Sequence, residues 1–167
     1  MATRTTLPSS FSSGAVLTAT NMNDLRGAFR ILQVVNASYG VSTTNNTSTM
    51  ADTGLTATIT PSFTSSTILV LVSQNGCYKT SANAENRMNL RLMRGATALT
   101  TFCNGLFLYT GTAIGNGATA SLCYLDSPAS TSALTYKTQF ANPNNTAGVI
   151  TQESSSLSTM TLLEISA

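Results

Sequence analysis

The sequence contains no histidine and no tryptophan, and only 8% of its 167 residues are charged. The missing histidine excludes the Ser/His/Asp and Cys/His catalytic arrangements, because both need an imidazole to move a proton. A typical soluble domain has about 25% charged residues. Here Ser, Thr, Asn and Gly replace them, beside an ordinary hydrophobic fraction of 42%. These shortages remove most of the titratable groups from which active sites are built.

The six acidic residues do not form a pattern typical of paired carboxylate catalysis. Asp52 and Asp126 each precede turn residues, and we expect Glu164 to point outward from the last strand. The chain also lacks a Gly-x-Ser-x-Gly elbow, and its glycine-rich stretch at 111–117 lacks the Lys-Ser/Thr end of a phosphate-binding loop. We therefore predict a protein that is not an enzyme and has no catalytic residues.

Cysteines are few, and their spacing argues against a metal site. Cys77, Cys103 and Cys123 are odd in number and include no Cys-x-x-Cys pair. We expect three buried free thiols, with one disulfide and a spare thiol as the alternative. We expect neither a metal nor another cofactor.

Basic residues are also sparse, and the net charge is only +2. Nucleic-acid binding needs a basic stripe, so we predict no nucleic-acid partner. The single cluster is Arg87, Arg91 and Arg94, in which Arg87 and Arg91 share one face of a predicted strand. Two interpretations stay open for these two arginines. They lie on a solvated or interface-facing strand edge, or they contact a phosphate or an acidic glycan of a receptor.

No apolar run approaches the roughly 20 residues that a membrane helix needs, so we predict no membrane insertion. The longest run, Ile68–Val72, is as long as a strand. It is continuous and rich in β-branched residues, which predicts a strand covered on both faces. The first residues lack the features of a signal peptide, so we expect synthesis in a cytoplasm.

Residues 1–30 differ from the rest and predict an extended anchoring arm with one short helix. Thr18 or Thr20 can cap a helix that runs through residues 21–25. The apolar residues of this stretch form one stripe, and the helix is too short to be stable alone. The stretch must therefore pack either on this domain or on a neighbouring protein, and we predict that it is a docking arm that uses Leu17, Met22, Leu25 and Phe29.

From residue 31 the apolar pattern changes to a period of two, which predicts strands. Met88, Leu90 and Leu92 alternate with polar residues, and the last strand reaches the C-terminus. Asn75-Gly76 is expected to turn the chain, and Asn104-Gly105 is a hairpin signal. We predict an all-β domain over 31–167, a jelly-roll-like sandwich of about eight to ten strands.

The shortage of charge also predicts a partner. Small uncharged polar groups are desolvated more cheaply than Lys and Glu, whereas a monomer usually depends on charge for solubility. We infer that much of this surface is covered by copies of the chain or by another protein. Closed symmetry is usual for such subunits, and a threefold axis would bury the low-charge faces.

The run SGAVLTATNMNDL at 13–25 resembles the short N-terminal segment of many bacteriophage tail-fibre and related virion proteins. In those proteins a Gly-x-x-Leu-Thr-Ala-x-x-Asn-x-Leu-like run precedes the fibre, and this chain departs from it at Met22. The body also resembles phage structural domains, in the segments 31–35, 52–61 and 124–128 with 136–137. The resemblance implies a trimeric β-sandwich similar to a fibre knob. It would be made in the host cytoplasm and held on the virion by its arm.

Two functions remain open within this resemblance. The first is a tail-fibre-like adhesin that touches a host-surface glycan or protein through loops at 42–48, 79–86, 111–117 and 142–147. The second is a capsid decoration (cement) protein whose knob clamps neighbouring capsid subunits. The N-terminal run favours the first, and the lack of a shaft between arm and knob favours the second.

Overall fold

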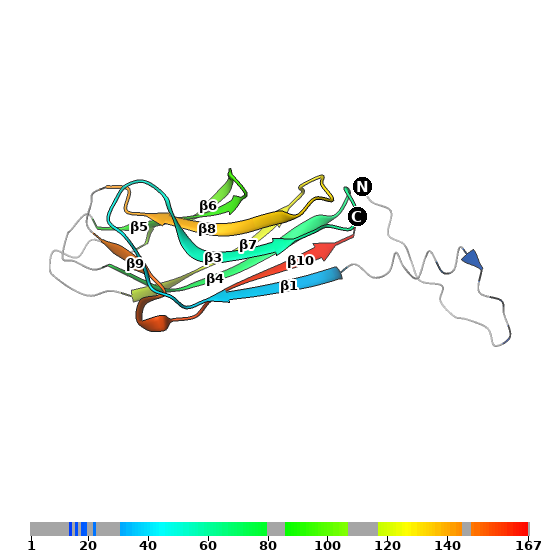
Figure 1. The fold of residues 1–167 in the computed structure, drawn as a ribbon, viewed down its shortest axis with the longest axis horizontal. Helices are drawn as coiled ribbons and strands as arrows, with labels where there is room; N and C mark the ends of the chain where they lie inside the picture. Colours follow the sequence, from blue (N-terminus) through cyan, green and yellow to red (C-terminus); the bar gives the residue numbers. More distant parts are fainter. Residues whose placement is uncertain are drawn as a thin grey trace.

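The structure, a computed structural model, describes residues 31–79, 86–106, 117–144 and 148–166, and before them Gly14, Val16, Thr18, Ala19 and Met22. The described residues form ten strands in two antiparallel sheets, which confirms the predicted all-β sandwich (Figure 1). The strands are β1 (Ile31–Tyr39), β2 (Thr43–Asn45), β3 (Ala51–Ile59), β4 (Thr67–Lys79), β5 (Met88–Arg94), β6 (Thr97–Leu106), β7 (Gly117–Asp126), β8 (Leu134–Ala141), β9 (Val149–Thr151) and β10 (Ser158–Ile165).

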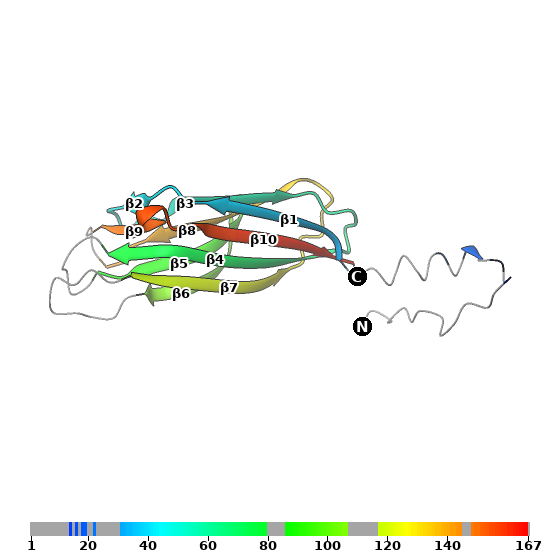
Figure 2. The same ribbon diagram turned by 90° about the horizontal axis from the view of Figure 1, so that it is seen from below.

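Sheet A is built around the long strand β4. Strand β7 pairs with one edge of β4, while β10 and β9 pair with successive stretches of the other edge. Strands β1 and β2 then pair with β10 and β9. The 3-10 turn η1 (Glu153–Ser155) separates β9 from β10. Sheet B has the order β3-β8-β5-β6, and Figure 2 shows β1, β10, β4 and β7 side by side in the other layer.

The core between the sheets consists of two apolar clusters. The larger includes Leu55, Val70 and Leu162, and the smaller includes Met88 and Phe140. Alternation places these side chains inward, because successive residues of a strand point to opposite faces. Tertiary burial of this kind holds the short strands together, since each strand alone is unstable in water.

Hydrogen-bonded polar side chains are also buried between the sheets. The Thr138 hydroxyl donates to Gln74 Oε1 at 2.8 Å, and its oxygen lies 2.6 Å from that of Thr53. Gln74 Nε2 in turn donates to the Ser158 hydroxyl at 3.1 Å. All four residues are fully buried, so this network, which we call the core polar network, links the two sheets.

The sandwich has two distinct ends. At one end, the arm end, Ile31 pairs with Ile165, and Ile165 pairs with Thr67. At the other, the loop end, Lys79 pairs with Val149, in the same region of sheet A where Tyr78 pairs with Gly117. Figure 1 shows that β1 begins and β10 ends at the same end, away from β9. At the loop end β4 ends at Lys79, β7 begins at Gly117 and β9 begins at Val149.

Two predictions concern the arm and strand β4. Met22 N donates to Thr18 O at 3.1 Å, so Ala19 and Met22 lie in a helical turn, whereas Leu17, Leu25 and Phe29 fall outside the described residues. The prediction that both faces of residues 68–72 are covered is wrong for the single chain. The inward side of β4 is buried, but Leu71 on its outward side is 38% exposed.

Candidate functional site

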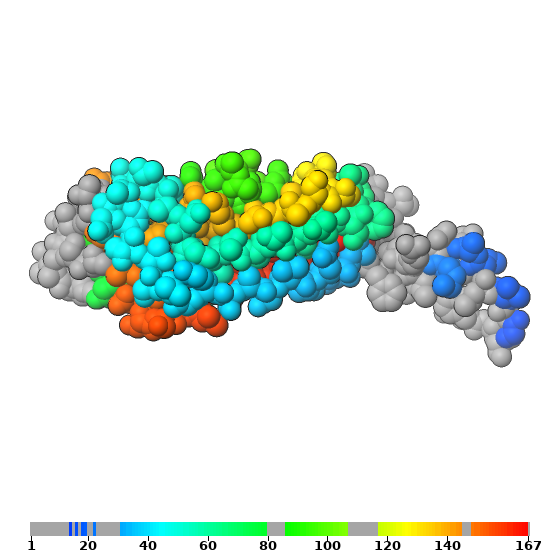
Figure 3. Space-filling model, viewed as in Figure 1, coloured from blue at the N-terminus to red at the C-terminus, as the bar shows by residue number. Residues whose placement is uncertain are grey.

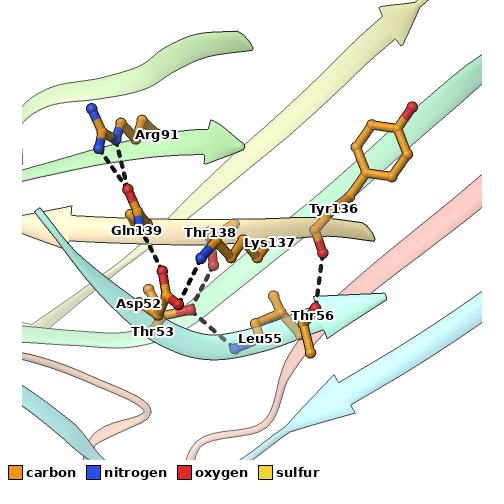
Figure 4. Close-up of polar contacts among 9 residues, drawn as sticks. All are labelled: Asp52, Thr53, Leu55, Thr56, Arg91, Tyr136, Lys137, Thr138 and Gln139. Carbon is orange, nitrogen blue, oxygen red and sulfur yellow. Dashed lines mark hydrogen bonds and ion pairs between the residues drawn. The ribbon is translucent and has the colours of Figure 1, made fainter. Parts of the chain in front are cut away.

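The candidate functional site is a row of polar side chains across the outer face of sheet B, which we call the sheet B polar row (Figure 4). Arg91 donates to Gln139 Oε1 through both Nε, at 2.9 Å, and Nη2, at 2.6 Å. Gln139 Nε2 donates to Asp52 Oδ1 at 2.6 Å, and Lys137 Nζ lies 2.8 Å from Asp52 Oδ2. The row therefore joins β5, β8 and β3.

Strand register brings these residues together. Gln139 is directly opposite Arg91 on β5 and opposite Asp52 on β3, so the three side chains share one face. Lys137 lies two residues before Gln139 on the same face. Directly opposite side chains on neighbouring strands are within reach of each other, which explains the continuous hydrogen bonding.

Asp52 is the only acidic group of the row, and its neighbours determine its pKa. Burial alone would raise the pKa of Asp52, but hydrogen bonds from Lys137 and Gln139, with the charges of Lys137 and Arg91, lower it overall. The Asp52 side chain is 51% exposed, so its ion pair with Lys137 contributes little to stability. The row has one anionic and two cationic side chains on a face that is otherwise rich in Thr. This surface is therefore polar and only weakly charged.

The structure does not bring the two predicted contact arginines to a common partner. Arg87 is exposed just before β5 and donates from Nη2 to Asn144 Oδ1 at 2.7 Å, near the loop end. Arg91 is half-buried and binds Gln139. A guanidinium has five donors, and those of Arg91 that do not bind Gln139 have no partner among the described residues. Each arginine could contact a ligand separately.

Arg94 lies apart from the other two arginines because it points toward sheet A. Its Nη1 pairs with Asp126 Oδ2 at 2.6 Å, and the buried Tyr136 hydroxyl donates to the same oxygen at 2.6 Å. Burial and the Asp126 carboxylate raise the pKa of Tyr136. This triad joins β5 and β8 of sheet B to the end of β7. The triad could not be predicted from the sequence, because Asp126 precedes Ser127-Pro128 and has the position of an ordinary turn residue.

Glu164 is the clearest correction to the sequence analysis. We expected it to point outward, but it is fully buried at the arm end. Its carboxylate accepts hydrogen bonds from Ser62 N and Gln33 Nε2, both at 2.6 Å, and from Ser66 Oγ at 2.7 Å. Burial alone would raise the pKa of Glu164, but these donors lower it overall. The prediction assigned Glu164 to the wrong face of β10. The pattern is ambiguous there because both of its neighbours, Leu163 and Ile165, are apolar.

The cysteines differ from the predicted set of buried thiols. All three are free, but only Cys77 is buried, while Cys103 is partly exposed and Cys123 is exposed. Burial raises the pKa of the Cys77 thiol to about 12, so this thiol is protonated at neutral pH. Among the described residues, no three His, Cys, Asp or Glu side chains gather in a group that could hold a metal ion.

The other predicted contacts are distributed between the two ends. Met22 of the arm stripe is 47% exposed. Of the predicted loops, 42–48 contains the short strand β2, Lys79 ends β4, and Gly117 begins β7. Residues 80–85, 111–116 and 145–147 fall outside the described residues. None of the helical residues in the described part of the chain belongs to a helix long and apolar enough to cross a membrane.

Comparison with known proteins gives no family. No protein-family model matches this chain, and no curated protein matches it. The resemblance to phage virion proteins therefore stays a prediction.

Proposed function

We propose that this protein is a non-enzymatic structural component of a phage particle. In this proposal it is a trimeric knob that is docked through its N-terminal arm and presents its loop end to the host surface. The observation that supports it best is that the two ends of the body differ. The arm precedes Ile31 at one end of the sandwich, whereas Lys79 at the end of β4, Gly117 at the start of β7 and Val149 at the start of β9 lie at the opposite end. A subunit held at one end and recognised at the other needs this arrangement.

The strand order supports a jelly roll, a topology common in viral capsid and lectin domains. Strands β1 and β2 can be taken together as one interrupted strand, and so can β9 and β10. Each sheet then has four strands. Their orders become β1/β2-β9/β10-β4-β7 and β3-β8-β5-β6. We infer a jelly roll from this order, with successive strands mostly alternating between the two sheets.

Host contact in this proposal involves the exposed arginines and the loop end. Arg87 lies at the loop end and Arg91 in the sheet B polar row, and both can donate to a glycan or to an acidic group on a protein. The sparse charge of the remaining surface suits hydrogen bonding to a neutral sugar more than strong ionic attraction.

The alternative is a capsid decoration protein. One observation favours it: β1 begins at Ile31, directly after the arm stretch, so no shaft separates the arm from the knob. A cement protein needs no shaft, because its body lies directly on the capsid.

Two measurements on the virus that encodes the chain test the proposal. We expect quantitative mass spectrometry of purified particles to find a few dozen copies for a fibre and hundreds for a cement protein. We expect added full-length protein to block adsorption of the virus to host cells if the protein is a fibre. Arg87→Ala should weaken this competition, whereas Thr64→Ala, at an exposed arm-end residue, should not. Absence of the chain from purified particles would refute both functions.

A further inference from the structure

An apolar row crosses the entire outer face of sheet A. Val34 on β1 is paired with Leu163 on β10, Leu163 with Leu69 on β4, and Leu69 with Leu125 on β7. The two outermost members are open to solvent, since Val34 is 58% and Leu125 56% exposed. Strand β1 forms an uncovered strip along one margin of the body (Figure 3). Four aligned branched aliphatic residues form a continuous band, unlike scattered single exposed residues, which need no explanation.

The band continues toward the arm end and fades toward the loop end. Ile31 is 54% exposed at the arm end, and Leu71, one row nearer the loop end, is 38% exposed beside the exposed Cys123. In the row beyond, the aligned residues are all polar, namely Ser38, Thr159, Ser73 and Ser121. We call the apolar part, Ile31, Val34, Leu69, Leu71, Leu125 and Leu163, the sheet A patch.

No charged side chain points outward from the strands of sheet A in the described part of the chain. The acidic and basic residues of these strands, Lys79, Asp126 and Glu164, are all buried. The outer face of sheet B is different, because it carries Asp52, Arg91 and Lys137. Of the two outer faces, only that of sheet B carries charged strand residues, and that of sheet A is uncharged over the strands that the structure describes.

This distribution of charge favours a second copy of the chain over an unrelated protein as the partner that covers the sheet A patch. Near a rotation axis, each charged group lies close to its own symmetry copy, and like charges repel. A face that meets itself is therefore best without charge, whereas a face for another protein can use charge to select its partner. We propose that the sheet A patch packs against the same patch of other copies, around the threefold axis of the trimer proposed above. This inference rests on that trimer and names the surface that holds it.

The size of the face agrees with this role. Four strands about 4.8 Å apart, each with about nine residues at 3.4 Å, give a face of about 600 Å² in projection. Specific interfaces begin at about 600 Å² per partner. Around a threefold axis the face is shared between two neighbours, about 300 Å² for each, so it supports weak to moderate self-association. Ile31 lies within the patch. Packing of copies here would therefore bring their arms together at one end of the assembly.

The test uses the full-length chain at micromolar concentration, with mass measured by light scattering. We expect the wild type to have three chain masses and the double variant Val34→Lys, Leu125→Lys to have one, with unchanged far-ultraviolet circular dichroism. The matched control is Thr58→Lys, Thr135→Lys on the outer face of sheet B, where both threonines are exposed, and it should stay trimeric. If the lysine variant does not fold, the milder Val34→Thr, Leu125→Thr should still weaken the trimer at least tenfold.

Cys123 gives a second readout because it lies beside Leu71. We expect a thiol reagent to modify Cys123 at least tenfold faster in the lysine variant than in the wild type, as located by peptide mass spectrometry. A lysine variant that stays trimeric would overturn the assignment of the patch and leave the trimer standing. A wild type that is monomeric would overturn both, while the copy number in particles would still test the virion role separately.

The arm is the competing cover for the patch, and an arm variant separates the two. Leu25→Asp, Phe29→Asp should leave both the trimer and the protection of Cys123 unchanged. Fast modification of Cys123 in this variant, with the trimer intact, would show that the arm covers the patch and would overturn the proposal.

Discussion

Thr138 is a polar residue between two core aromatic residues, Tyr136 and Phe140, on the inward side of β8. It is tolerated there because its hydroxyl group bonds to Gln74 of the opposite sheet and to Thr53 of the neighbouring strand. A buried polar group without such partners would be costly. The core polar network therefore fixes how the two sheets face each other, in addition to holding them together.

We predict that Thr138→Val destabilises the protein by about 1–3 kcal/mol, because it leaves the buried Gln74 oxygen without its donor. Valine has nearly the same shape, so the effect measures the hydrogen bonds. The control is Thr135→Val on the same strand, where the hydroxyl makes an exposed bond with Thr58, and it should cost less than about 0.5 kcal/mol. Urea unfolding at neutral pH measures both. Equal losses would show that the buried network contributes nothing special.

Individual side-chain partners could not be predicted from the sequence. Arg91 was selected correctly as an outward-facing residue, but its partner Gln139 is 48 residues away. The pairing depends on β5 lying beside β8, which is decided by the topology and not by local pattern. Glu164 shows the same limit, since its donors Ser62 and Ser66 come from the turn between β3 and β4.

At the scale of elements, both Asn-Gly pairs lie inside strands instead of turning the chain. Gly76 has φ of 58° within β4, and Gly105 has φ of 84° within β6. The strand register shifts at both places, so each is a bulge. Bulges and tight turns both use a left-handed residue, which is why the sequence signal is the same. Alternation predicted the strands well, but it could not separate these two uses of glycine.

Gly76 is also close to the backbone of the η1 region. A Cβ atom at this position would lie 2.5 Å from Glu153 N, whereas one at Gly95, with nearly the same φ of 56°, would meet nothing. Gly95→Ala should cost about 1–2 kcal/mol from the left-handed conformation alone. Gly76→Ala should cost about 1–3 kcal/mol more because the backbone has to move. Equal losses of unfolding free energy in urea would mean that the η1 backbone moves away from the new Cβ atom at no cost.

At the scale of the whole molecule, the sparse titratable groups predict a broad plateau of stability with pH. No histidine titrates near neutrality. The lowered pKa values of Asp52 and Glu164 contribute stability above the unfolded values near 4, which is lost as pH falls through the folded values. The raised pKa values of Cys77 and Tyr136 contribute stability that is lost above about pH 8.5, where the unfolded chain releases protons first. Thermal unfolding from pH 3 to 10 should show both limbs.

Glu164→Gln tests the acid limb. At neutral pH it should cost about 2 kcal/mol or more, because an amide group replaces an oxygen that accepts from Ser62 and Ser66. The difference from the wild type should shrink as pH falls below about 4, because Glu164 of the unfolded chain then takes up a proton before the folded carboxylate does. Glu153→Gln is the control, since its carboxylate makes no hydrogen bond among the described residues. A Glu164→Gln difference that stayed constant from pH 7 to pH 3 would contradict the prediction.

The place where the arm meets the sandwich also has a mechanical consequence. A pull on the arm reaches the body at Ile31, and when the opposing hold is at the loop end, the tension runs along β1. Hydrogen bonds between antiparallel strands lie perpendicular to the strands, so this tension shears the whole β1–β10 ladder at once instead of peeling it open bond by bond. The body therefore resists rupture best when it is pulled between its two ends, which is the direction of load in the proposed attachment role.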